Sequence, residues 1–267
     1  MKLSRAQMFE EMGLGPVWRL REQAGCTPPE ATSEVDSQPV ATPIAAPTAT
    51  ARPNAARPAA PAAAPHGLDW PALRQSIADC TACGLCRDRR QAVPGVGDEQ
   101  ADWLFIGEGP GAEEDARGEP FVGQAGKLLD AMLAAIDLRR GENVYIANAV
   151  KCRPPGNRTP EAEEMKACWP FLKRQIALLR PKLIVLLGRV AMQAVLNEER
   201  ALGASRGKLF EYRDGELVVP VIVTYHPAYL LRNLTDKAKA WEDLCLARRT
   251  MRDQQAAGMD LPLPPAG

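Results

Sequence analysis

Residues 103–115 read WLFIGEGPGAEED, in which an apolar run leads directly into a glycine-rich turn and an acidic segment. Four apolar residues in a row predict a strand that is covered on both faces. Three glycines and a proline predict a tight turn that lets a ligand approach main-chain N–H groups. Such a turn is more often a plain connection, and it matches neither a P-loop nor the GxGxxG fingerprint of dinucleotide-binding proteins. On its own, the stretch predicts a strand end and not yet a site.

Apolar runs alternate with amphipathic segments along the chain after residue 68. Strands are expected at residues 103–106, 144–149, 183–187 and 218–224. Helices are expected at residues 126–138, 160–179, 190–197 and 237–252. This alternation predicts a three-layer α/β/α sandwich with a central, mostly parallel sheet. In such sheets ligands bind beyond the carboxyl ends of the strands, so a site is expected in the loops there.

Composition limits the class of protein. The chain has 267 residues, of which 46% are hydrophobic, and its 33 lysines and arginines equal its 33 aspartates and glutamates. A balanced charge is mild evidence against non-specific coating of nucleic acid, but it leaves room for an enzyme with a local basic groove. The longest apolar runs are too short to cross a membrane. We therefore expect a soluble, cytoplasmic protein.

Four parts are expected along the chain. Residues 1–26 form a short helical segment whose apolar side chains need a partner or the chain's own domain to cover them. Residues 27–66 are rich in alanine and proline, which is typical of a disordered linker. Residues 67–255 form the α/β domain, and residues 256–267 form a disordered tail.

Four cysteines form the pattern that points most directly to chemistry. Cys80 and Cys83 lie in the run CTAC, and Cys152 and Cys168 follow far downstream. Disulfides need an oxidising compartment, and the start MKLSRAQMFEEMGLG lacks the apolar core of a secretory signal. The spacing therefore favours one metal centre held between distant parts of the fold.

Two further loops carry polar side chains after expected strands. Asn148 lies in YIANAVKCRPPGNR, residues 145–158, and an amide there can read the edge of a heterocycle. His226 begins HPAYLLRN, residues 226–233, and is one of two histidines in the chain. A histidine at a strand end is a reasonable acid or electrophile. Each residue alone is explained equally well as a cap of its turn or strand.

Together these segments resemble the family 4, iron-sulfur uracil-DNA glycosylases. The resemblance covers residues 80–252 and rests on the ordered set CTAC, GEGPGAEED, PFVGQAG, YIANAVKCRPPGNRTP, LIVLLG, RGK and HPAYLLR. It implies a uracil-DNA glycosylase fold. It also implies a monofunctional enzyme that hydrolyses the N-glycosidic bond of uracil in DNA to start base-excision repair.

The resemblance also implies a cofactor, a 4Fe-4S cluster held by Cys80, Cys83, Cys152 and Cys168. Four thiolates suit such a cluster, and zinc in the same ligands remains an alternative. Cys86 follows in CTACGLC and is expected to be a spare thiol. Cys26 and Cys245 are expected to be bystanders.

Roles in catalysis and base binding follow from the same resemblance. Phe121 is expected to stack on a uracil that has left the duplex, and Asn148 to bond its edge. His226 is expected to donate towards uracil O2. The pocket lining and the residue that positions water are assigned to Glu108, Gly109 and Pro110. Related glycosylases place an aspartate where this chain has Gly109, so Glu114 and Asp115 remain candidates for the base.

Contacts to DNA are expected from two groups of residues. The loop Leu230, Leu231 and Arg232 is expected to fill the gap that the uracil leaves in the base stack. Phosphates are expected to meet Lys151, Arg153, Arg206 and Lys208.

The start of the chain resembles a different protein. Residues 14–21 read LGPVWRLR, which is similar to the opening of the psi subunit of the bacterial clamp loader. The likeness implies that residues 1–22 bind replication clamp-loader machinery. Two functions other than an active glycosylase remain open. The protein could be an inactive, psi-like subunit with a glycosylase scaffold, or an iron-sulfur redox sensor. Nothing in the sequence suggests an obligate dimer, so a monomer is expected.

Overall fold

The computed structural model describes Pro65 and residues 67–259, with side chains to residue 256. These residues belong to a compact unit that spans Ala56–Gly267. The expected helical segment at residues 1–26, most of the linker and the tail from residue 260 lie outside the described residues. Within the described part, no helix is long and apolar enough to cross a membrane.

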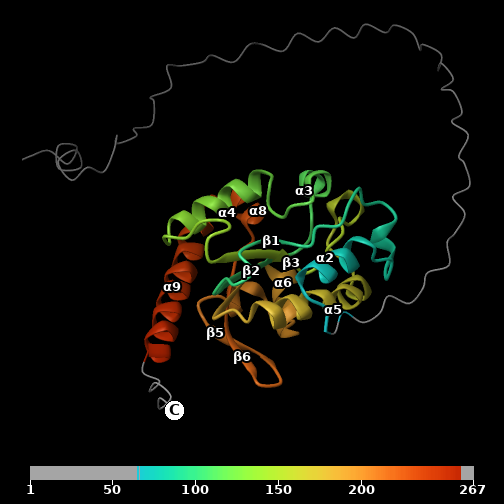
Figure 1. Ribbon diagram of the computed structural model, residues 1–267. Helices are drawn as coiled ribbons and strands as arrows, with labels where there is room; N and C mark the ends of the chain where they lie inside the picture. Colours follow the sequence, from blue (N-terminus) through green and yellow to red (C-terminus); the bar gives the residue numbers. More distant parts are fainter. Residues whose placement is uncertain (1–64, 66, 260–267) are drawn as a thin grey trace, which may run out of the picture. The chain divides into compact units, whose positions relative to one another are not determined.

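A six-stranded sheet in the order β1-β3-β2-β4-β6-β5 forms the middle layer (Figure 1). Its four central strands are parallel, as the sequence predicts: β2 (Trp103–Gly107), β3 (Val144–Asn148), β4 (Leu183–Leu187) and β6 (Leu217–Thr224). Every residue of β2, β3 and β4 is buried. Burial on both faces explains why these strands read as continuous apolar runs and not as alternating patterns.

Two edge strands were not predicted from the sequence. β1 (Val96–Gly97) pairs antiparallel with β3, and β5 (Leu209–Asp214) pairs antiparallel with β6. Strand β5 alternates exposed and buried residues and carries charges, so it lacks the apolar run that marks the central strands.

Successive residues of β2 point to opposite faces of the sheet, and each face has its own helices. Trp103 and Phe105 pack with α4 (Gln124–Ala134), α8 (Pro227–Arg232) and α9 (Lys237–Met259). Leu104 and Ile106 pack with α5 (Ala162–Leu179) and α6 (Arg189–Leu196). Figure 1 shows α4 and α5 on opposite sides of the sheet. The predicted three-layer sandwich is confirmed.

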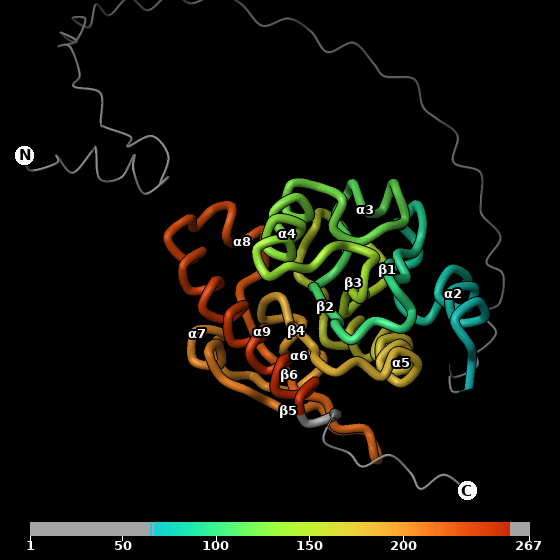
Figure 2. The backbone as a smooth tube through the Cα atoms, turned by 60° about the vertical axis from the view of Figure 1, so that its left-hand side comes forward, coloured from blue at the N-terminus to red at the C-terminus, as the bar shows by residue number. Residues whose placement is uncertain are grey.

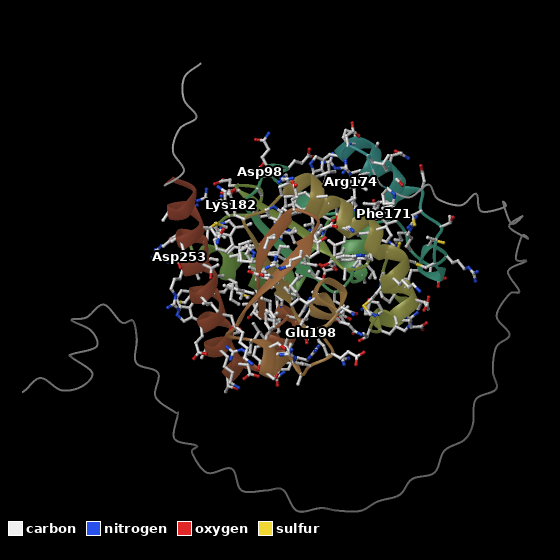
Figure 3. All side chains as sticks on the ribbon, turned by 90° about the horizontal axis from the view of Figure 1, so that it is seen from below. Asp98, Phe171, Arg174, Lys182, Glu198 and Asp253 are labelled. Carbon is white, nitrogen blue, oxygen red and sulfur yellow. The ribbon has the colours of Figure 1, made fainter. Side chains whose placement is uncertain are left out.

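Shorter elements lie beside these layers. They are α2 (Trp70–Ala78), η1 (Gly84–Cys86), α3 (Ala112–Arg117), η2 (Pro155–Asn157), α7 (Leu202–Ser205) and η3 (Leu234–Asp236). Leu73 and Ile77 of α2 form a third apolar cluster with Phe171 of α5. Arg174 of α5, labelled in Figure 3, donates to the Leu68 carbonyl at 2.7 Å. These contacts hold the segment before β1 against α5.

The four expected helices are present with shifted ends. Helix α4 starts and stops earlier than expected, because Gly123 caps it and the chain turns after Ala134. Helix α9 continues to Met259, past the expected end at Arg252 and past the domain boundary at residue 255. The sequence has no glycine or proline between Arg252 and Ala257 to stop it.

The loops that follow β2, β3 and β6 meet at one edge of the sheet, because parallel strands share a carboxyl end. Gly107 of β2 lies opposite Asn148 of β3 in the parallel register. Figure 2 shows α3, α4 and α8 at the same end of the backbone trace. The sheet therefore brings residues from three distant motifs into one region.

Candidate active site and thiol pocket

A cavity of about 500 Å³ lies at the carboxyl edge of the sheet. All six residues expected to bind the base line it, and they come from four segments: Glu108, Gly109, Pro110, Phe121, Asn148 and His226. The sequence did not single out several other lining residues, including Tyr229, Pro154 and Thr159. They lie within the motifs HPAYLLR and YIANAVKCRPPGNRTP, but the sequence does not indicate which residues of these loops line the cavity.

Asn148 is the polar centre of this cavity. It is 2% exposed, and its Oδ1 is the buried side-chain N or O atom, among the described residues, that has no hydrogen-bond partner. An unpaired buried amide oxygen costs about 1–3 kcal/mol, so it marks a place for a ligand donor. A Cβ on the opposite residue, Gly107, would lie 2.6 Å from this oxygen and 2.5 Å from Phe121 Cζ. Glycine at 107 is therefore required for Asn148 and Phe121 to meet at the cavity.

Phe121 adopts a strained backbone conformation. Its φ is 56°, in the left-handed region that costs a bulky residue about 1–3 kcal/mol. The ring is 6% exposed, and its centroid lies 5.5 Å from the centroid of the His226 ring. Phe121 thus offers an apolar face in the cavity beside the imidazole.

His226 is the N-cap residue of α8, and its hydrogen bond fixes where its proton lies. The Ala228 N–H donates to His226 Nδ1 at 3.1 Å. A neutral imidazole that accepts at Nδ1 carries its proton on Nε2 and can donate from that atom. Burial, and to a lesser degree the positive charge of Arg232, lower the pKa of His226 to about 4. At neutral pH, the cavity therefore contains an uncharged donor.

Glu108 follows β2 directly and supplies a carboxylate to the cavity. Burial raises its pKa above the ordinary value for glutamate, while the charge of Arg189 and a hydrogen bond with Thr159 act in the opposite direction. A Cβ at Gly109 would lie 2.7 Å from Val150 Cγ2, so a larger residue at this position would require Val150 to shift.

Glu114, which also lines the cavity, and Asp115 are the other candidate bases, and both are bonded to main-chain N–H groups. Glu114 Oε1 accepts from the Val122 and Gly123 N–H groups at 2.9 and 3.2 Å, and Oε2 accepts from Gly111 N–H at 3.0 Å. Asp115 is buried and accepts from the Arg90 N–H at 2.9 Å. Both carboxylates hold main chain in place, which leaves Glu108 as the better placed base.

Two residues expected at DNA are buried, and a third, Arg206, is mostly covered. Lys151 is 1% exposed, and its Nζ donates to the Asn148 carbonyl at 2.8 Å and to Gln175 Oε1 at 2.6 Å. Leu230 is 1% exposed and packs in the core under α8. Arg206 pairs with the buried Asp243 at 3.1 Å. Burial keeps Lys151 and Leu230 from reaching DNA, so these two predictions need correction, while a contact from Arg206 stays a prediction.

Other expected DNA contacts remain accessible. Leu231 is 41% exposed at the end of α8, next to the exposed Arg232, which also lines the cavity. Lys208 is exposed and Arg153 is half-buried, with its Nε donating to Asn157 Oδ1 at 2.7 Å. The exposed apolar tip therefore is Leu231 alone and not the Leu230–Leu231 pair.

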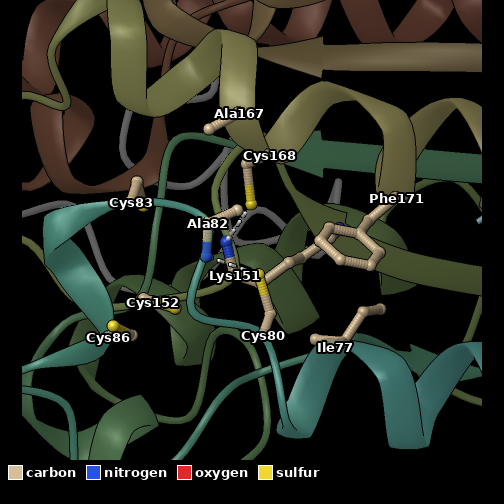
Figure 4. Close-up of a pocket in the computed structure, with 10 residues that line it drawn as sticks. All are labelled: Ile77, Cys80, Ala82, Cys83, Cys86, Lys151, Cys152, Ala167, Cys168 and Phe171. Atoms are coloured by element: carbon tan, nitrogen blue, oxygen red, sulfur yellow. Dashed lines mark hydrogen bonds between the residues drawn. The ribbon is translucent and has the colours of Figure 1, made fainter. Parts of the chain in front are cut away.

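A second, smaller pocket gathers the cysteines (Figure 4). The four expected ligands and Cys86 all line it, together with Lys151 and apolar side chains. The described cysteines are free thiols. Cys83 is the N-cap of η1 and Cys86 is its last residue, and the Cys86 N–H donates to the Cys83 carbonyl at 3.4 Å, so this short turn keeps Cys86 close to Cys83. The sequence did not predict that the spare thiol would face this pocket.

Hydrogen-bond donors surround the thiols. Lys151 N–H donates to Cys168 Sγ at 3.2 Å, and Arg89 Nη1 donates to Cys152 Sγ at 2.7 Å. Arg89 also donates to the carbonyls of Ala78 and Cys80, so it joins the CTAC loop to Cys152. Burial raises the pKa of Cys168 to about 12, and such a thiol ionises only if a metal compensates its charge. Arg89 lies in no recognisable motif, so the sequence could not have indicated its contact with Cys152.

The spread of the thiols bears on which metal fits. Across residues 67–256, no three cysteine, histidine or acidic side chains converge closely enough to hold a single ion. A tetrahedral zinc needs all four sulfurs within about 2.3 Å of one point, whereas each cysteine of an iron-sulfur cluster binds a different iron. Four thiols with N–H donors to the sulfurs of Cys152 and Cys168 are a donor set that fits either metal group.

The state of His226 can be measured directly. We expect ¹⁵N and ¹H NMR titration to give a neutral imidazole with its proton on Nε2 from pH 8 down to near the pKa of about 4. The Ala228 hydrogen bond and burial are the reasons. A short histidine-containing peptide serves as the reference, and a pKa for His226 at its ordinary value would contradict the geometry.

Comparisons with known proteins agree with this geometry. The model of the uracil DNA glycosylase superfamily matches residues 94–245. Type-4 uracil-DNA glycosylases are similar: that of Archaeoglobus fulgidus is 48% identical over 59% of this chain and 80% of its own length. Those of Pyrobaculum aerophilum and Thermotoga maritima are 40% and 43% identical, over 67% and 62% of this chain and 93% and 84% of theirs. Together with the conjunction of Asn148, Phe121 and His226 at one sheet edge, these matches establish that the chain belongs to the uracil-DNA glycosylase superfamily.

Proposed function

We propose that this protein is a monofunctional uracil-DNA glycosylase that removes uracil from DNA by hydrolysis and so starts base-excision repair. The observation that carries the proposal is the buried Oδ1 of Asn148, which has no partner within the described residues and lies at the cavity beside Phe121. Uracil N3–H is a donor of the kind that this oxygen lacks. Cytosine has no proton at N3, so it would leave the amide oxygen unpaired.

Base recognition combines this amide with the aromatic ring. The cavity lies beyond the sheet, so a base must leave the duplex to enter it, which costs least for a mispaired or single-stranded nucleotide. The uracil stacks on Phe121, accepts from Asn148 Nδ2 at O4 and donates from N3 to Oδ1. Unpaired polar groups in a desolvated pocket make discrimination against other bases steep.

Bond cleavage uses His226 and Glu108. The C1′–N1 bond breaks, and the electron pair leaves with uracil as an anion whose charge lies partly on O2. The neutral His226 donates from Nε2 to that oxygen and stabilises the charge. Water attacks C1′, and Glu108 positions it and accepts its proton. No lysine lines the cavity within the described residues, which favours hydrolysis over a Schiff-base reaction.

DNA binds along the rim of this cavity. Leu231 is the exposed apolar side chain at the tip of α8, where it would enter the base stack. Arg232 lines the cavity, Arg153 precedes the lining residue Pro154, and Lys208 is exposed; these three side chains would meet phosphates.

The thiol pocket would hold a 4Fe-4S cluster through Cys80, Cys83, Cys152 and Cys168. Their sulfurs receive N–H donors from Arg89 and Lys151, and the four residues join α2, the loop after β3 and α5. Such a cluster supplies a closed, four-cysteine crosslink. Its role here is structural, since it fixes the loop that begins at Asn148.

Uracil release tests the assignment of the active site. We expect Asn148→Ala and His226→Ala each to lower kcat/KM on a uracil-containing oligonucleotide by about 10²- to 10³-fold, because each removes a buried partner of the base. Gln100→Ala, an exposed residue outside the cavity, is the matched control. The wild-type rate should be level between about pH 6 and pH 8, since His226 stays neutral.

On the acid side, the rate should fall as Glu108 is protonated, at a pH above that of an ordinary glutamate because burial raises its pKa. Glu108→Gln should remove this acid limb. A cluster-loaded wild type that releases no uracil would refute the proposed activity.

Iron analysis tests the ligand set. We expect anaerobically purified wild type to contain iron and inorganic sulfide, and Cys80→Ser to lose both. Cys86→Ser should keep both, since Cys86 is the spare thiol of the pocket. If Cys86→Ser loses as much iron as Cys80→Ser, Cys86 is a ligand, and zinc without sulfide in the wild type would rule out the cluster.

The proposal for residues 1–22 is a binding segment for replication clamp-loader machinery, and it rests on sequence alone. A tether of about 40 residues would let the glycosylase domain act while the segment stays bound. Full-length protein should co-elute with a purified clamp-loader complex, and a variant without residues 1–26 should not, with equal uracil release by both. Failure of full-length protein to co-elute would remove this partner.

A further inference from the structure

Phe121, in the centre of the active site, has a left-handed φ of 56°. Glycine would adopt this conformation without strain, but phenylalanine does not. A bulky residue keeps such a conformation only where its surroundings over-determine it. The groups that hold the main chain on either side of Phe121 therefore decide whether its ring lies in the cavity.

Two charged side chains hold this loop from opposite sides. Arg140 Nη1 donates to the Pro120 carbonyl at 2.9 Å, and Nη2 donates to the Phe121 carbonyl at 2.8 Å. Glu114 accepts from the next two N–H groups, those of Val122 and Gly123. The cation holds consecutive carbonyls and the anion holds consecutive amides, so the turn between them is fixed.

The guanidinium is itself fixed in place. Arg140 Nε donates to Asp130 Oδ1 of α4 at 3.0 Å, and the Arg140 side chain is 25% exposed. Gly126 of the same helix gives the Phe121 carbonyl room, because a Cβ there would lie 1.7 Å from that oxygen. Helix α4 thus supports the Phe121 main chain both through Asp130 and Arg140 and by direct contact.

We propose that Arg140 is a positioning residue for uracil binding, which acts by holding the strained main chain of Phe121 so that its ring forms one face of the base pocket. The inference rests on the proposed function. Arg140 does not line the cavity. A planar guanidinium suits the task, because its fork of donors reaches two neighbouring carbonyls at once.

A double-mutant cycle with free uracil as the probe tests the proposal on the full-length, cluster-loaded protein. We expect Arg140→Met to raise the inhibition constant of uracil by about tenfold, within the range that stacking on one aromatic ring contributes. Phe121→Ala should raise it by a similar factor. The double variant should show no further increase, because both changes remove the same contact.

Arg139→Met is the matched control. Arg139 is the neighbouring arginine, its side chain is 79% exposed and it pairs with Glu142 instead of the loop. The inhibition constant of uracil for Arg139→Met should equal that for wild type. Independent, multiplying effects of Arg140→Met and Phe121→Ala would overturn the proposal, as would an unchanged constant in Arg140→Met.

A second readout does not need activity. The Phe121 ring lies beside the imidazole, so its ring current shifts the His226 ring protons. Arg140→Met should move these protons towards their shifts in Phe121→Ala, and an unmoved signal would overturn the proposal. If wild type releases no uracil, the proposed function fails, while this NMR comparison still decides the role of Arg140. Should Arg140→Met fold poorly, Asp130→Asn should give a smaller shift in the same direction.

Discussion

The parallel pairing of Gly107 with Asn148 is the constraint on which the active site depends. It places the amide of Asn148 at the carboxyl edge of the sheet, and the missing side chain at Gly107 leaves the space where Asn148 Oδ1 and the Phe121 ring approach each other. The turn after β2 then presents Glu108, and the end of β6 presents His226. All three strands are parallel, and their last four residues are buried, so these groups are carried by a well-packed part of the molecule.

The thiol pocket and the base pocket share one loop. Asn148 is the last residue of β3, and Lys151 lies three residues further on. The Lys151 ammonium donates a hydrogen bond to the Asn148 carbonyl, and the Lys151 main-chain N–H donates one to Cys168 Sγ. A buried ammonium without a carboxylate partner is costly, and burial lowers the pKa of Lys151 to about 8 while the nearby thiols act in the opposite direction. Ionised cysteines would therefore stabilise the charge beside the residue that reads the base. The proposed cluster would in this way support the active site without taking part in bond cleavage.

Much of the fold could be predicted from sequence, because buried parallel strands are continuous apolar runs and their loops held the distinctive motifs. The edge strands β1 and β5 could not, since one is two residues long and the other is exposed and charged. Lys151 and Arg206 show what the sequence could not predict about the site. A basic residue near a motif is interpreted as a phosphate contact, and only the tertiary structure reveals its buried partners. Arg140 and Arg89 act through main-chain carbonyls and sulfurs of distant segments, and sequence spacing carries no sign of such contacts.

The position of uracil itself tests the central claim most directly. A crystal structure of the iron-loaded protein with free uracil should place the base in the cavity, stacked on Phe121, with N3–H on Asn148 Oδ1 and O2 facing His226 Nε2. The amide oxygen that has no partner in the described structure would then have one. Uracil bound outside this cavity, or bound inside it with Asn148 Oδ1 still unpaired, would contradict the account.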